Sequence, residues 1–265
     1  MSACRTASIQ PCTFAFEKDW YAQRVPQLRV EFVGNPIVDR CKKFKAAAAR
    51  TSAEPPPAMV VRQSKIVLLP GSRKAELLHH VPILAEVARR IAAAQMATFR
   101  MVLPNEALLT LARSLLRGDE QIELQTGVLD KALAQADLAI TKSGTITLEL
   151  ACFGVPAIVI YKTSPLTYFV GKRVVTVQHL AMPNLLAKET LFPEFIQADA
   201  TPEKISSAAL ELLRDEPRRL KIKAKLAEIV SSLGGEDASR RAARILIQLL
   251  MPEGSRGTAS RQIQV

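Results

Sequence analysis

The stretch from Gln135 to Lys162 constrains the fold more than any other part of this sequence. An apolar run from Ala136 to Thr141 leads into a turn of small polar residues, Ser143 to Thr145. A helix-like segment follows, Gly154 ends it, and a second apolar run extends from Pro156 to Tyr161. This order predicts a strand–helix–strand unit, with its turn at the edge where an open α/β sheet binds ligands.

Strand and helix patterns alternate from Lys65 up to this unit, at intervals typical of a parallel sheet, and the pattern loosens after Tyr161. The segments before it that we expect to be strands are Lys65–Leu69, Thr98–Leu103 and Gln121–Gln125. The expected helices are Lys74–Ala94, Glu106–Arg117, Val128–Gln135, a helix opened by Thr201 and Pro202, Glu216–Ser232 and Gly235–Leu250. The sequence therefore predicts an α/β fold with a Rossmann-like, doubly wound parallel sheet.

Composition divides the chain into four segments. Residues 1–40 contain one or two elements without a core of their own, and we expect them to be the end of a domain whose beginning is absent. Residues 41–64 are basic, then rich in alanine and proline, which is typical of a linker. Residues 65–250 form the predicted domain, and 251–265 form a polar tail.

The charge balance favours an anionic partner. The 265 residues include 36 Lys and Arg against 25 Asp and Glu, which gives a net charge of +11, and 48% of the residues are hydrophobic. An anionic membrane surface, phosphorylated substrates and nucleic acid all fit that charge. Nucleic acid fits least well, because aromatic residues make up only 5% and no nucleic-acid-binding motif is present. The basic clusters also fit ordinary solvated helix faces.

Several chemistries lack the residues they need. The four cysteines and three histidines show no metal-ligand spacing, so no metal is expected. No Walker A, GxGxxG or GxSxG motif occurs, and no organic cofactor is predicted. The first residues lack the apolar core of a signal peptide, and no apolar run reaches about 18 residues. A reduced, cytosolic protein fits this pattern best.

Two strand-to-helix turns have the residues of a phosphate site. In the first, Gly71 allows close approach of the backbone, Ser72 can cap the following helix, and Arg73 offers a bidentate guanidinium. In the second, Ser143, Gly144 and Thr145 present hydroxyls and backbone N–H groups at a helix start. Either turn alone could be an ordinary capped turn.

Glu149 is an isolated carboxylate among apolar neighbours, four residues after Thr145 on the same predicted helix. Because this helix starts at the ligand edge of the sheet, its carboxylate could accept both hydroxyls of a ribose. The alternative is a solvated glutamate on a helix surface.

An ordered set of motifs resembles the lipid-A-disaccharide synthase family of inverting GT-B glycosyltransferases. The segments are FVGNPIVD (32–39), LLPGSRKAEL (68–77), KSGTITLE (142–149), YKTSPLTY (161–168) and MPNLLA (182–187), and the resemblance extends from about Cys12 to Leu250. It implies two Rossmann-like domains, the second of which binds the nucleotide sugar. The implied reaction joins UDP-2,3-diacylglucosamine to 2,3-diacylglucosamine 1-phosphate, at the cytoplasmic face of the bacterial inner membrane.

The resemblance also implies roles for individual residues. Arg73 and Asn184 match functionally important, catalytic positions of the family. Gly71 and Ser72 belong to the same arginine motif, and Ser143, Gly144, Thr145 and Glu149 match the loop and helix that hold UDP. Glu149 would bind the ribose and the Ser143–Thr145 turn the pyrophosphate.

Two departures from the family pattern affect the expected activity. Asn35 occupies a position where the family commonly has histidine. The amino-terminal domain of the family is not found in this chain, and the base that deprotonates the acceptor hydroxyl belongs there. We therefore expect a synthase that needs the missing half; the alternatives are a UDP-sugar-binding module that pairs with a separate half, and another UDP-N-acetylglucosamine-using GT-B enzyme.

Overall fold

The computed structural model describes residues 9–42, 63–118, 121–163, 178–235 and 237–250. Contacts divide the chain into two compact units, one formed by Phe44–Ile229 and the other by Met1–Lys43 together with Val230–Val265. The boundary falls inside helix α10 (Glu216–Ser232), so this helix contributes residues to both units.

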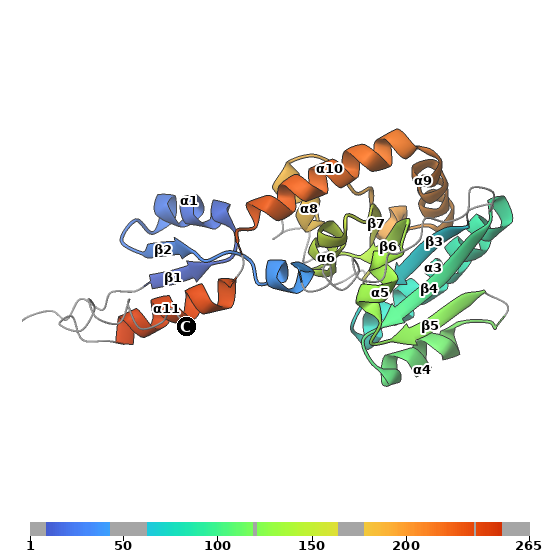
Figure 1. The fold of residues 1–265 in the computed structure, drawn as a ribbon. Helices are drawn as coiled ribbons and strands as arrows, with labels where there is room; N and C mark the ends of the chain where they lie inside the picture. Colours follow the sequence, from blue (N-terminus) through green and yellow to red (C-terminus); the bar gives the residue numbers. More distant parts are fainter. Residues whose placement is uncertain (1–8, 43–62, 119–120, 164–177, 236, 251–265) are drawn as a thin grey trace, which may run out of the picture. The chain divides into compact units, whose positions relative to one another are not determined.

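The larger unit contains a six-stranded sheet in the order β5-β4-β3-β6-β7-β8, and every neighbouring pair is parallel (Figure 1). Its strands are β3 (Ser64–Leu69), β4 (Ala97–Leu103), β5 (Ile122–Thr126), β6 (Leu138–Lys142), β7 (Ala157–Tyr161) and β8 (Glu194–Ile196). The apolar runs of the sequence form these strands because both faces of a parallel sheet are covered. Leu68, Leu138, Ile140 and Ile158 are accordingly fully buried.

The chain leaves the centre of this sheet in two directions. From β3 it proceeds through β4 to β5, then returns to β6 beside β3 and continues through β7 to β8. Such an order creates a switch point between β3 and β6, and open parallel sheets bind ligands at the carboxyl ends of the strands at that point. The predicted doubly wound parallel sheet is thus confirmed.

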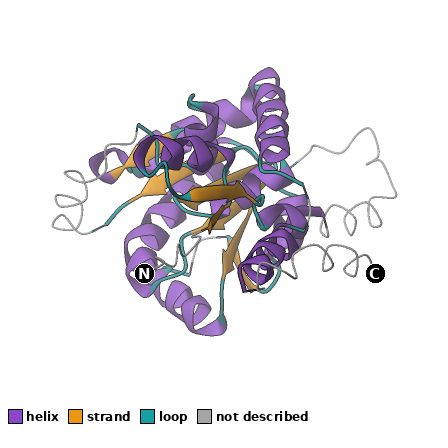
Figure 2. Cartoon of the chain, turned by 90° about the vertical axis from the view of Figure 1, so that its left-hand side faces the viewer, coloured by secondary structure: helices purple, strands orange, loops and turns teal. Residues whose placement is uncertain are grey.

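Helices cover both faces of the sheet, because right-handed crossovers that move in opposite directions place their helices on opposite faces (Figure 2). Contacts join α3 to α4 and α9, and α6 to α5 and α8. The helices of this unit are α3 (Lys74–Ala94), α4 (Glu106–Leu115), α5 (Leu129–Ala134), α6 (Ile146–Phe153), α8 (Met182–Ala187) and α9 (Pro202–Arg214), with the 3₁₀ helix η1 (Gln197–Asp199).

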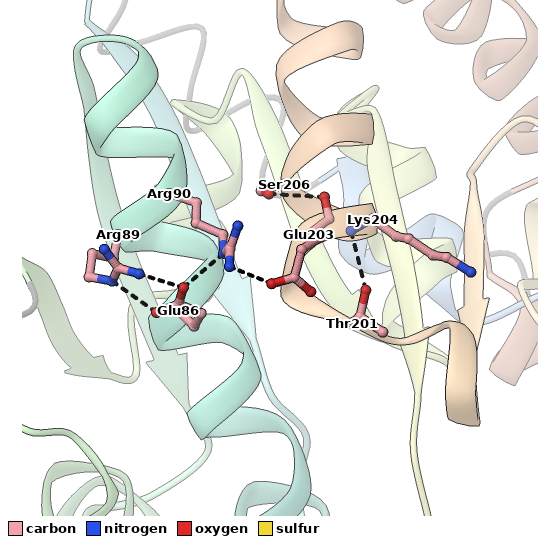
Figure 3. A network of polar contacts seen from close by, with 7 residues as sticks. All are labelled: Glu86, Arg89, Arg90, Thr201, Glu203, Lys204 and Ser206. Atoms are coloured by element: carbon pink, nitrogen blue, oxygen red, sulfur yellow. Dashed lines mark hydrogen bonds and ion pairs between the residues drawn. The ribbon is translucent and has the colours of Figure 1, made fainter.

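A charged network attaches α9 to α3 (Figure 3). On α3, Glu86 accepts hydrogen bonds from Arg89 at 2.8 and 2.6 Å and from Arg90 at 2.8 Å. Arg90 also donates to Glu203 near the start of α9. Thr201 caps that start by accepting from the backbone N–H of Lys204 at 3.3 Å, as its position before Pro202 predicts.

The smaller unit contains the parallel pair β1 (Ile9–Cys12) and β2 (Arg29–Phe32), with helices α1 (Ala15–Arg24) and α11 (Ala238–Leu250). Arg241 of α11 donates to the carbonyl of Val33 at 2.8 Å, and the backbone N–H of Asp237 donates to Asp39 at 2.7 Å. The sequence interpretation assigned residues 65–250 to one domain, whereas these contacts group α11 with β1 and β2.

Most predicted elements have the expected type, and α3 and α10 have the expected bounds. The strand β8 and the helix α8 were not expected. The segment 164–177, which includes most of the YKTSPLTY motif, lies outside the described residues.

Two properties bear on where such a protein can work. None of the helices in the described ranges is long and apolar enough to cross a membrane. Cys12 is a buried free thiol, and Cys41 and Cys152 are buried as well.

Candidate functional site

The two predicted turns lie side by side at the switch point. The first, Pro70 to Arg73, follows β3 and leads into α3; the second, Ser143 to Thr145, follows β6 and leads into α6. Because β3 and β6 are hydrogen-bonded neighbours and both turns follow carboxyl ends, the topology brings together the two segments that the sequence singled out separately.

The first turn is shaped by Glu76, which sequence reasoning did not single out. Glu76 Oε2 accepts the backbone N–H groups of Ser72 at 2.7 Å and Arg73 at 3.2 Å. Arg73 is the N-cap of α3 and makes no side-chain cap hydrogen bond. The expectation that Ser72 caps this helix is therefore wrong: Glu76, three residues after the N-cap, reaches back to the turn as in a capping box.

A residue larger than glycine would not fit at position 71, because Glu76 occupies the space that its side chain would need. The φ angle of Gly71 is 133°, and an added Cβ would overlap Glu76 Oε2 and lie 2.8 Å from Glu76 Cβ. Arg73, in contrast, points to solvent: its side chain is 82% exposed, and its Nη1 is 3.9 Å from Glu76 Oε1. Arg73 can thus reach an anion in front of the turn.

The second turn is anchored on both sides. The backbone N–H of Ser143 donates to the carbonyl of Ile160 at 3.1 Å, and its hydroxyl donates to the carbonyl of Leu180 at 2.8 Å. Thr147 closes the turn by donating its hydroxyl to the carbonyl of Gly144 at 2.7 Å. Thr145 is exposed at the start of α6, where the helix dipole and the N–H groups of the first turn favour an anion.

An ion pair joins the two turns. Lys142, the last residue of β6, donates from Nζ to Glu76 Oε1 at 3.0 Å. Burial alone would raise the pKa of Glu76, but the hydrogen bonds from Ser72 and Lys142 outweigh it and lower the pKa below the ordinary value. Glu76 is therefore a carboxylate that holds one turn through its backbone and the other through Lys142.

Glu149 lies in the first turn of α6, one helical turn after Thr145. Glu149 is partly buried, and its sequence neighbours Leu148 and Leu150 are both buried. The structure therefore places this carboxylate at the same end of β6 as the Ser143–Thr145 turn, and it is not the fully solvated helix residue of the alternative interpretation.

Asn184 is fully buried, and neighbouring groups occupy its amide. Its Oδ1 accepts the backbone N–H groups of Leu191 at 3.0 Å and Phe192 at 2.9 Å. Its Nδ2 donates to the carbonyl of Phe192 at 2.8 Å and to Glu194 Oε1 at 2.7 Å. These four bonds use both donors and both acceptor positions of an amide, so the geometry supports a positioning role and not the expected catalytic contact.

Glu194, at the start of β8, extends this network to the second turn. Its carboxylate accepts the backbone N–H groups of Leu180 at 2.8 Å and Ala181 at 3.0 Å. Since Ser143 donates its hydroxyl to the carbonyl of Leu180, a chain of hydrogen bonds connects Asn184 to the turn. The sequence signal was a lone glutamate within the apolar stretch Leu191–Ile196.

His80 connects the first turn to the end of β7. Its Nδ1 donates to the carbonyl of Pro70 at 2.6 Å, and its Nε2 accepts the backbone N–H of Lys162 at 3.1 Å. Both bonds require the neutral ring with the proton on Nδ1. The sequence interpretation placed His79 and His80 together as surface or partly buried residues; His79 is exposed, but His80 is 1% exposed.

This geometry predicts that the protein loses stability in mild acid. Burial lowers the pKa of His80, against the opposing effects of its bond to Pro70 and the charge of Glu76. Unfolded histidine titrates near pH 6.5, so below about that pH the unfolded state binds the proton first. The free energy of unfolding should then fall as pH drops, with a slope of at most about 1.4 kcal/mol per pH unit. Urea denaturation from pH 7.5 to 5.5 measures it; His80→Leu should flatten the curve and His79→Gln should not.

Asn35 is the last residue of the sequence analysis to place in the structure. Asn35 Oδ1 accepts the backbone N–H of Ile37 at 3.1 Å and so caps the helical segment that follows in the smaller unit, a role that accounts for asparagine at this position. Among the described residues, no group of three or more His, Cys, Asp or Glu side chains could hold a metal ion.

The strand order defines a Rossmann-like α/β domain of the GT-B class. Its fold is similar to that of UDP-GlcNAc 2-epimerase from Neisseria meningitidis bound to UDP-GlcNAc, with a TM-score of 0.56 and 14% identity over 84% of this chain and 56% of that one. A second UDP-N-acetylglucosamine 2-epimerase structure gives a TM-score of 0.52 over 93% and 59% of the two chains. At such low identity, these likenesses establish the fold alone.

The chain belongs to the lipid-A-disaccharide synthetase family, whose sequence profile matches residues 11–248. It is 35% identical over 251 residues to the lipid-A-disaccharide synthase of Geobacter sulfurreducens and 36% identical over 243 residues to that of Nitrosococcus oceani. These matches cover 89% and 90% of this chain but 61% and 60% of the relatives. The chain thus spans about three fifths of the length of these relatives, and the family is a family of glycosyltransferases.

Proposed function

We propose that this protein is a lipid-A-disaccharide synthase whose 44–229 unit binds the donor, UDP-2,3-diacylglucosamine. The transferred sugar would join 2,3-diacylglucosamine 1-phosphate through a β-1,6 bond, with release of UDP. The observation that carries this proposal is the meeting of two strand-to-helix turns at the switch point between β3 and β6. Membership of the lipid-A-disaccharide synthetase family supports the choice of these sugar substrates.

Each group of the nucleotide has a candidate partner. In the Ser143–Thr145 turn, the backbone N–H groups of Gly144 and Thr145 at the start of α6 would hold the pyrophosphate. The backbone N–H and the hydroxyl of Ser143 already donate to the carbonyls of Ile160 and Leu180, so Ser143 would position the turn. Glu149 would accept the ribose hydroxyls, and the exposed guanidinium of Arg73 would stabilise charge on the leaving diphosphate or on the acceptor phosphate.

The role proposed for the 44–229 unit is confined to the donor. An inverting transfer needs a base that takes the proton of the acceptor 6-hydroxyl, and we assign that step to none of the described residues. The proposed place of work is the inner face of the bacterial inner membrane, where the net charge of +11 would favour anionic lipids. A separately encoded amino-terminal half remains the proposed partner.

The test of the donor site is the affinity for UDP. We expect Glu149→Ala to weaken UDP binding by about 1–3 kcal/mol, because ribose hydroxyls lose a charged acceptor in a partly buried site. Titration calorimetry of the 265-residue chain measures the change. Glu123→Ala is the matched control, because Glu123 lies on the edge strand β5, which β4 and β3 separate from β6.

The outcomes separate the candidate functions. Equal UDP affinity of wild type and the Glu149 variant would remove Glu149 from the site. A wild-type chain that does not bind UDP would contradict the donor site as a whole. If UDP-N-acetylglucosamine and the diacylated donor compete equally for the site, a different UDP-N-acetylglucosamine-using enzyme would replace the synthase.

A further inference from the structure

The ion pair between Glu76 and Lys142 lies against both proposed phosphate turns. Glu76 Oε2 lies where a side chain of Gly71 would be, and Lys142 lies beside Gly144. A Cβ on Gly144 would be 3.1 Å from Lys142 Cε and 3.3 Å from Lys142 Nζ. The two glycines, which the sequence analysis assigned to the approach of a ligand, thus also make room for this pair.

The ammonium group of Lys142 therefore lies at the start of α6, where the helix dipole is already positive. Two positive groups repel each other there, and an anion placed between them would relieve that repulsion. Glu76 accepts one of the three protons of the ammonium, so two donor directions remain. Lys142 is 21% exposed, which holds the ammonium in place yet leaves it within reach of a ligand.

We propose that Lys142 is a further phosphate-binding residue of the donor site and that Glu76 is the residue that positions it. This inference rests on the proposed binding of UDP to the 44–229 unit. Through its two oxygens, Glu76 fixes the ammonium against the second turn and the backbone of Ser72 and Arg73 in the first. The diphosphate then meets two turns that are held at a fixed distance before it arrives.

The simpler interpretation is that Glu76 only caps α3. The chain contains a matched example: Glu17 of α1 accepts the backbone N–H groups of Thr13 and Phe14, both at 2.9 Å, in the same capping geometry. Within the described part of the chain Glu17 makes no ion pair with a lysine, whereas Glu76 also binds Lys142 at the end of β6. Replacing each glutamate by glutamine separates the contribution of the cap from that of the pair.

The sign of the effect on UDP affinity distinguishes positioning from simple electrostatics. Glu76 is an anion beside a proposed anion site, so simple electrostatics predicts that Glu76→Gln tightens UDP binding. Positioning predicts the opposite, about a tenfold loss, which corresponds to a coupling of about 1.4 kcal/mol. Lys142→Met should cost a similar factor. The double variant should lose no more than either single variant, because each removes the same unit.

Calorimetric titration of UDP and of UMP into the full chain tests the proposal. UMP lacks the second phosphate, so the loss in Lys142→Met and Glu76→Gln should be clearly smaller for UMP than for UDP. A structural defect would weaken both nucleotides alike. Glu203→Gln, which removes the contact of α9 with Arg90 (Figure 3), and Glu17→Gln should leave both affinities unchanged.

Three results would overturn the inference: tighter or unchanged UDP binding in Glu76→Gln, fully additive losses in the double variant, or equal losses for UDP and UMP. In each case UDP would still bind the wild type, so the proposed function would stand. A wild-type chain without UDP binding would instead remove the proposed function and this inference together.

Discussion

Replacing Asn184 with alanine is expected to destabilise the protein by about 3–5 kcal/mol, the upper end of what single substitutions cost. The truncation would leave the backbone N–H of Phe192 buried without its acceptor and the carbonyl of Phe192 without its donor. The backbone N–H of Leu191 would keep only its 3.1 Å bond to the carbonyl of Glu189. A buried polar group without a partner has lost its hydrogen bonds to water and gains none from the protein. Urea denaturation followed by circular dichroism measures the free energy of unfolding.

Asn105→Ala is a matched control for this prediction. Asn105 is exposed and makes one cap hydrogen bond, from the backbone N–H of Leu108 at 2.9 Å, so its loss should cost about 1 kcal/mol. A family-derived catalytic role makes a different prediction for Asn184→Ala, namely a loss of activity with unchanged stability. Wild-type stability of the variant would therefore contradict the positioning role and favour contact with substrate.

The fold could be predicted because the elements that form it depend on local patterns. Apolar runs buried on both faces gave the strands β3 to β7, and helix periodicity gave the bounds of α3 and α10. The strand β8 was missed because it is three residues long and follows Phe192 and Pro193, a pattern that resembles a loop. The grouping of α11 with the smaller unit was missed because polar contacts such as Arg241 to Val33 join residues about 200 positions apart.

The two turns of the candidate site could be singled out from the sequence, but the residues that hold them in place could not. Gly71, Arg73 and Ser143 stand out because turn chemistry and the family motifs mark them. Glu76 and Lys142 are 66 positions apart in sequence, and only the pairing of β3 with β6 reveals that they meet. A capping-box signal was present in the spacing of Arg73 and Glu76, but it gives no information about a partner on another strand.

His80 and Asn184 show another limit of prediction from sequence: the binding partner of a buried polar side chain. The sequence marks both as polar residues of interest, yet it cannot tell whether a buried polar group faces a ligand or the backbone. In the structure the ring of His80 binds backbone groups just after β3 and β7, and the amide of Asn184 binds backbone groups just before β8. Both side chains therefore stabilise backbone segments next to the sheet, whereas Arg73 and Thr145 are exposed at the turns after β3 and β6.

The substitution Gly71→Ala is expected to abolish UDP binding and to cost several kcal/mol of stability. A φ angle of 133° lies outside the region that residues with a Cβ adopt, and the added methyl group would overlap the carboxylate of Glu76. Glu76 would have to leave the N–H groups of Ser72 and Arg73 and the ammonium of Lys142. The first turn and its link to the second would then be lost together.

Gly127→Ala provides the control, because Gly127 also has a positive φ angle, 70°, but nothing lies within 4 Å of an added Cβ. This variant should lose only the roughly 1–2 kcal/mol of the left-handed backbone and should bind UDP as the wild type does. Adding Glu76→Ala to Gly71→Ala removes the overlap with the carboxylate but keeps the 2.8 Å approach of the two Cβ atoms. The double variant should therefore regain only part of the stability and none of the UDP affinity. If Gly71→Ala alone kept wild-type UDP affinity, the contact of Glu76 with this turn would have no part in nucleotide binding.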